Sequence, residues 1–163
     1  MTTRYPLLLT LVVGALSLTA SPSSGEARRP VEIPERFRGA EQAVVGRVLK
    51  VEPTWRRFEN GDELIVSRVQ LAVEESLKGA RVQTVTVDVE GGQIGDLVLK
   101  VSDLPAMNVG ERAVVLLTRD RSGRSVPHLR GQGIMKLDRS NMVAGSGLTL
   151  DDIRAMARQA GER

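Results

Sequence analysis

Apolar and polar residues alternate over several stretches in the middle of the chain. The clearest stretch covers residues 63–77, where Ile65, Val69, Leu71 and Val73 share one parity and mostly polar residues lie between them. A period of two is typical of a β-strand with one buried face. Residues 113–117 are apolar throughout, so a strand there should be buried on both faces. Shorter runs predict further strands at residues 43–52, 82–89, 97–101, 126–129 and 134–137, with a weaker one at 142–144.

Turn signals separate these runs. Asn60-Gly61 is a preferred pair for a two-residue hairpin turn, because both positions tolerate positive φ. A turn at that point would place Trp55 opposite Val66. The glycine-rich segment at residues 91–95 predicts a loop. A phosphate-binding loop is not indicated, because neither a helix nor a Lys-Ser/Thr pair follows it.

The hydrophobic period changes to that of a helix near the C-terminus. Thr149 and Asp152 have the spacing of a capping box, and Leu150 and Ile153 begin one apolar face. We therefore expect a β domain at residues 40–145 and a short C-terminal helix within residues 146–163. Short strands at regular spacing favour a mainly β fold, a small antiparallel barrel or sandwich.

The N-terminus has the pattern of an export signal. Arg4 precedes an apolar run at residues 7–18, which is too short for a spanning helix, and small residues follow. We expect a signal peptide at residues 1–20, with cleavage after Ala27 as an alternative and an uncleaved anchor as another. After cleavage no stable membrane anchor would remain. Residues 21–39, rich in Ser, Pro, Arg and Glu, predict a flexible linker.

Composition narrows the possible chemistry. The 163 residues include no cysteine, one histidine and four aromatic residues, and the net charge is +3. Disulfides, thiol catalysis and cysteine-based zinc sites are therefore excluded. Few aromatic residues and interspersed charges argue against a nucleic-acid partner.

The order of several short motifs resembles netrin-like domains, which include the N-terminal domains of the tissue inhibitors of metalloproteinases. The motifs are AVVGRV at 43–48, ESLKG at 75–79, GGxxG at 91–95, VGE at 109–111 and VVLL at 114–117. The chain resembles more closely a set of uncharacterised exported bacterial proteins with the same order of elements. The resemblance covers roughly residues 40–138 and implies an OB-type β-barrel. It suggests an exported protease as one kind of partner, by analogy of fold only. The inhibitors act through an N-terminal cysteine, so no inhibitory residue carries over to this cysteine-free chain.

No catalytic, cofactor or metal site is predicted. Ser125 and His128 lie close in sequence, but nothing marks a carboxylate that would orient the histidine as a triad requires. Glu74 and Glu75 are adjacent in a predicted strand and point to opposite faces. A hydrolase with an unrecognised site stays open as an alternative.

One segment has the composition of a partner-binding site. It contains Trp55, Arg56, Arg57 and Phe58 beside the predicted hairpin turn, and Trp and Arg are enriched at interface hot spots. In the competing interpretation, Trp55 covers the end of the barrel and both arginines are solvated. We expect an exported, non-catalytic module that binds a protein partner in the periplasm or outside the cell. A structural envelope component is a further alternative.

Overall fold

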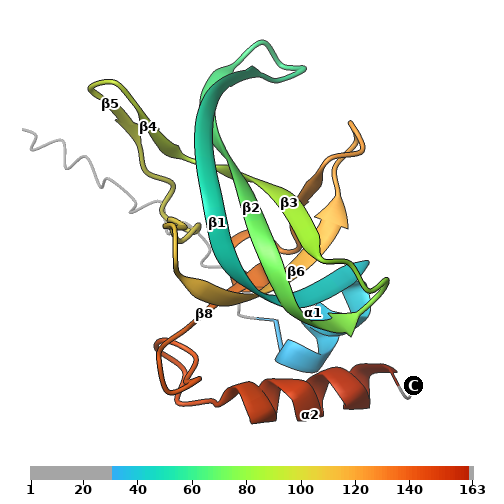
Figure 1. The fold of residues 1–163 in the computed structure, drawn as a ribbon. Coiled ribbons are helices and arrows are strands. Elements are labelled where there is room, and N and C mark those ends of the chain that lie inside the picture. Colours follow the sequence, from blue (N-terminus) through green and yellow to red (C-terminus); the bar gives the residue numbers. More distant parts are fainter. Residues whose placement is uncertain (1–30, 162–163) are drawn as a thin grey trace, which may run out of the picture.

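The computed structural model describes residues 31–161, and in this part the chain is mainly β, as predicted (Figure 1). The main sheet is antiparallel and six-stranded, in the order β3-β2-β1-β6-β7, with β8 also pairing with β6. The strands are β1 (Gln42–Arg57), β2 (Glu63–Lys78), β3 (Thr84–Glu90), β4 (Gly92–Ile94), β5 (Leu97–Leu99), β6 (Arg112–Arg119), β7 (Ser125–Pro127) and β8 (Ile134–Leu137). The helices are α1 (Ile33–Gly39), the 3₁₀ turn η1 (Arg130–Gly133) and α2 (Leu150–Gly161).

Strands β1 and β2 form one long hairpin whose turn differs from the prediction. Arg57 pairs with Glu63, and Trp55 lies opposite Ile65 instead of Val66. The Phe58 N–H also donates to the Asp62 carbonyl at 2.8 Å, so the loop has three residues, 59–61, rather than two. Gly61 takes the left-handed conformation, with φ of 89°. A three-residue loop that ends in a left-handed glycine is a common hairpin connection. The change shifts the pairing by one residue, so each side chain meets a different neighbour.

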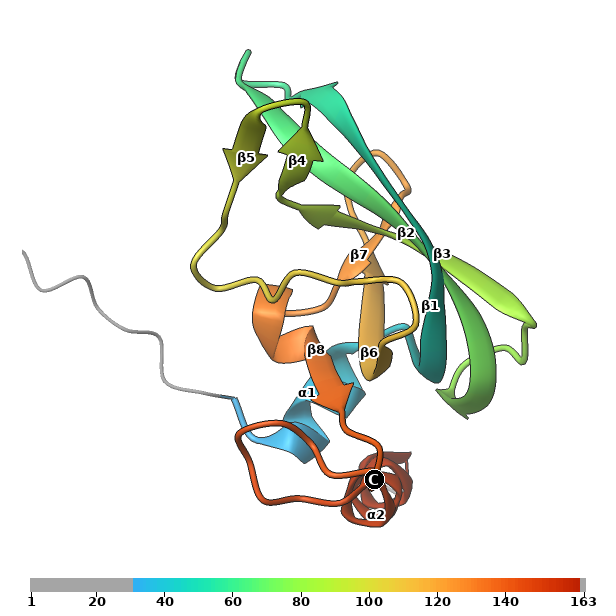
Figure 2. The same ribbon diagram turned by 60° about the vertical axis from the view of Figure 1, so that its left-hand side comes forward.

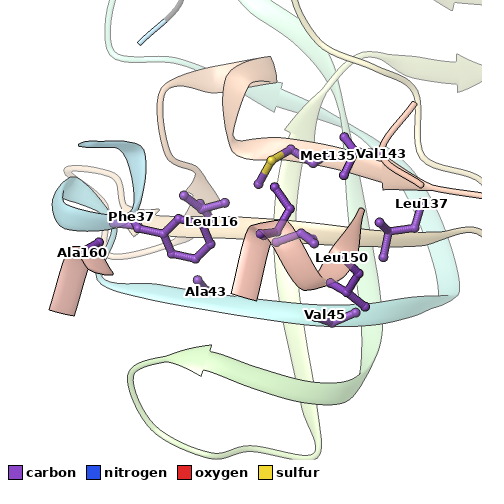
Figure 3. Packing of buried hydrophobic residues seen from close by; sticks show 12 residues of the cluster. Phe37, Ala43, Val45, Leu116, Met135, Leu137, Val143, Leu150 and Ala160 are labelled. Carbon is purple, nitrogen blue, oxygen red and sulfur yellow. The ribbon is translucent and has the colours of Figure 1, made fainter. Parts of the chain in front are cut away.

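The sheet separates two hydrophobic clusters, and β6 contributes to both. Val115 and Leu117 pack on one side with Val44, Leu71 and Val87. The expectation that β6 is buried on both faces is confirmed, because Val114 and Leu116 pack on the other side. That second cluster lies between the sheet and the helices, and it includes Phe37, Val45, Leu116, Met135 and Leu150 (Figure 3).

The C-terminal helix is confirmed as α2. Thr149 caps it as predicted, since its hydroxyl oxygen accepts the N–H of Asp152 at 3.2 Å. The Asp152 carboxylate accepts the N–H of Thr149 at 2.8 Å in return. Leu150 and Ile153 are buried against the sheet, which fixes the helix across its face.

The predicted flexible linker at residues 21–39 is wrong for its last part, because residues 33–39 form α1. Pro34 sits in the first turn, where its missing N–H costs nothing, and Phe37 is buried. Lys78 then holds the C-terminal end, donating from Nζ to the carbonyls of Phe37, Arg38 and Ala40 at 2.6–3.0 Å. Residues 21–30 and the predicted signal peptide lie outside the described residues.

The sheet is not closed into a complete barrel. Strands β3 and β7 lie near each other, but no hydrogen-bonded pairing joins them within residues 31–161. The predicted strand at 142–144 is reduced to isolated bridges at Met142 and Val143. None of the described helices is both long and apolar enough to cross a membrane.

Candidate binding surface

The glycine-rich segment predicted as a loop forms a second hairpin. Strands β4 and β5 pair with each other across Gly95-Asp96 and leave the edge of the main sheet (Figure 2). Gly92 is required at its base, because a Cβ there would meet the Ser67 hydroxyl, Pro53 and Ile65. Its φ of 136° is also unfavourable for any other residue. The two glycines at 91 and 92 thus let the chain leave β3 and pack tightly on the β1–β2 hairpin.

A largely apolar cavity of about 640 Å³ lies beside this hairpin. The main sheet contributes Val51, Val69 and Val89 to its wall, and the other wall comes from β5 and residues 100–108. Because these segments are distant in sequence, the cavity arises only when the sheet and the β4–β5 hairpin come together.

The β1–β2 and β4–β5 hairpins project at the same end of the molecule (Figures 1 and 2). Large apolar side chains are exposed there: Trp55 near the end of β1 is 50% exposed, Leu97 is 59% and Val98 is 54%. We call Trp55, Leu97 and Val98 the hairpin end. Exposure of several large apolar side chains in one region is typical of interaction surfaces.

The structure divides the predicted segment between two environments. Trp55 and Arg57 are exposed, whereas the side chain of Arg56 is only 15% exposed. Arg56 lies over the ring of Phe58, with 5.0 Å from its Cζ to the ring centroid. The competing interpretation, in which both arginines are solvated, is therefore wrong for Arg56, because successive side chains of a strand point to opposite faces.

Arg56 pairs with two carboxylates, one from β3 and one from the β6–β7 turn. It forms ion pairs with Asp120 at 2.7 Å and with Asp88 at 3.6 Å, and the Asp88 side chain is only 8% exposed. Burial raises the pKa of Asp120, but hydrogen bonds from Ser122, Arg56 and backbone N–H groups outweigh it and hold the pKa well below its ordinary value. The carboxylate thus stays ionised and ties the β6–β7 turn to the β1–β2 hairpin.

A second arginine neutralises charge beside the cavity. Arg130 donates to Glu90 at 3.1 Å and also pairs with Asp103. These hydrogen bonds raise the pKa of the Arg130 guanidinium. Glu90 lines the cavity, and its carboxylate is already paired within the chain, with a guanidinium that it shares with Asp103.

Ser125 and His128 do not form a catalytic pair. Ser125 lies in β7, whereas the imidazole of His128 packs against Gly39 at the end of α1. No hydrogen bond joins the two, and within residues 31–161 no carboxylate orients the imidazole. Residues 31–161 also contain no cluster of three or more His, Cys, Asp or Glu that could hold a metal ion.

No protein-family model matches the chain, and no curated protein matches it.

Proposed function

We propose that this protein is an exported, non-catalytic binding module that recognises a protein partner through the hairpin end. The observation that carries the proposal is the exposure of Trp55, Leu97 and Val98 on two projecting hairpins at one end of the fold. Folding leaves these side chains in water, where contact with a partner would bury them at a gain of about 25 cal/mol per Å².

The chemistry of the hairpin end suits a protein interface. An indole ring provides a large, rigid contact with little loss of conformational entropy, so Trp55 is the anchor of the proposal. The ion pairs of Arg56 with Asp88 and Asp120 brace the strand that carries Trp55. A braced anchor loses less freedom on binding than a mobile one.

Export is part of the proposal and has its own test. The apolar run at residues 7–18 supports it, together with Arg4 before the run and the small residues after it. We expect protein from the exported fraction to start at Ser21 or Arg28 on N-terminal sequencing. Material that starts at Met1 would contradict export by a cleaved signal.

Site-specific photocrosslinking tests the binding surface. We expect a photoreactive residue in place of Trp55 or Leu97 to give the same discrete crosslinked protein in cells that make this chain. The matched control replaces Val82, which is 39% exposed on a different part of the molecule. Crosslinks that are equally strong from position 82, or that join only copies of this chain, would overturn the proposal.

A further inference from the structure

We propose that the cavity beside the β4–β5 hairpin binds a free long-chain carboxylate, with its hydrocarbon chain inside and its carboxylate at Lys100. The volume of about 640 Å³ falls within the range of about 300–1,000 Å³ that is usual for small-molecule sites. Apolar side chains from four strands and one loop line it, including Val69, Val89, Leu99, Leu104 and Met107.

The polar groups of the wall favour a hydrocarbon over a peptide. The Ser67 hydroxyl donates to the Gly91 carbonyl at 2.7 Å, and the Gln93 amide donates to the Gly95 carbonyl at 3.0 Å. The Asn108 amide is likewise engaged, with Glu111. A peptide inside the cavity would lose its backbone hydrogen bonds to water and find few replacements, which is costly. A methylene chain has no such requirement.

The charges at the cavity favour an anion. Two charged residues line it, Glu90 and Lys100, and Glu90 already pairs with Arg130, a guanidinium that it shares with Asp103. Lys100 is exposed at the rim and, within the described part of the chain, has no hydrogen bond or ion pair. An apolar cavity with one unmatched ammonium group is complementary to an amphiphile whose single charge is negative.

Calorimetric titration of the exported protein with dodecanoate, kept below its micelle-forming concentration, tests this inference. We expect saturable binding at one site and weaker binding of dodecyltrimethylammonium, which has the same chain and the opposite charge. Lys100→Gln should weaken dodecanoate binding about two- to fivefold, the range for an exposed ion pair. The control Lys50→Gln removes another exposed lysine, which pairs with Glu52, and should change nothing. Equal affinity for the two amphiphiles would contradict the proposal that the site selects a carboxylate through Lys100.

A second pair of variants locates the bound chain. Ala106 is exposed on the cavity wall, so Ala106→Phe should fill the space without disturbing the core and weaken binding at least tenfold. Ala155→Phe, on the exposed face of α2, is the matched control. If Ala106→Phe binds like the unmodified protein while Trp55→Ser abolishes binding, the amphiphile sits on the hairpin end and the inference is wrong. The inference and the proposed protein binding can fail separately, because crosslinking from position 55 can succeed whether or not dodecanoate binds.

Discussion

Adjacent residues on β1 have opposite roles. Trp55 faces water and is free to contact a partner, whereas its neighbour Arg56 is enclosed between Asp88 and Asp120. Strand geometry causes the difference, since successive side chains point to opposite faces. Binding and stability can therefore be separated by substitutions at neighbouring positions.

Arg56→Ala should lower the free energy of unfolding by about 2–3 kcal/mol. The substitution removes an ion-pair partner from two carboxylates, one of them almost fully buried. Asp88 keeps its pair with Arg68 and Asp120 keeps its hydrogen bonds from the β6–β7 turn, so the loss stays below the about 3–5 kcal/mol for breaking a fully buried pair. Arg57→Ala is the matched control, because its pair with Glu63 is exposed and should contribute less than about 1 kcal/mol. Urea denaturation of both variants measures the difference. Equal losses of stability would contradict the assigned role of Arg56.

His128 should make stability fall in mildly acidic solution. Burial lowers its pKa below the ordinary 6.5, and the nearby Lys78 lowers it further. The unfolded chain then binds a proton more readily than the folded one, so this contribution is complete above about pH 6.5 and is lost as the pH falls below it. The melting temperature should therefore drop more between about pH 7.5 and pH 5.5 for the unmodified protein than for His128→Gln. The same dependence of melting temperature on pH in both proteins would show that the imidazole does not contribute to the pH dependence of stability.

At the scale of the elements, local patterns predicted some structure well and missed other parts. The alternation from Ile65 to Val73 predicted β2, and the Thr149–Asp152 spacing predicted α2. Helix α1 was missed although Pro34 is a helix-start signal, because the surrounding Pro, Arg and Glu composition suggested a linker. Strand β4 was missed because glycine normally disfavours strands. Here Gly92 is needed for its close approach to Ser67, a tertiary contact that no local pattern shows.

The docking of α1 should depend on Lys78. Its ammonium group holds three carbonyls at the C-terminal end of the helix, and one hydrogen bond to a charged group contributes about 1.5–3 kcal/mol. In Lys78→Met, hydrogen exchange should become faster across residues 33–39. The total loss of stability should be about that of one such bond, about 1.5–3 kcal/mol, because the three carbonyls share one ammonium group and can bond to water once it is gone. Lys50→Met is the control. Unchanged protection of α1 would show that burial of Phe37 alone holds the helix.

At the scale of the whole molecule, the mainly β architecture followed from the sequence but the candidate site did not. Trp55 was found from its residue type, and strand alternation could already have separated it from Arg56. The cavity could not be found in this way, because its walls come from Val51, Val69, Val89 and residues 98–108. These positions meet only through sheet pairing and the turn at Gly91-Gly92, both of which are long-range consequences of folding.

The position of β6 between the two hydrophobic clusters has a consequence for folding kinetics. The β1–β2 hairpin needs only a short loop, whereas β6 must find β1 across the intervening β2–β5 segment, and closing a longer loop costs more entropy. We expect β6 docking to set the folding rate, with α2 joining afterwards. In stopped-flow experiments Val115→Ala should chiefly slow folding, whereas Ile153→Ala should chiefly accelerate unfolding. If both substitutions act only on the unfolding rate, both clusters form after the transition state for folding. The pairing of β1 with β2 would then govern the folding rate instead.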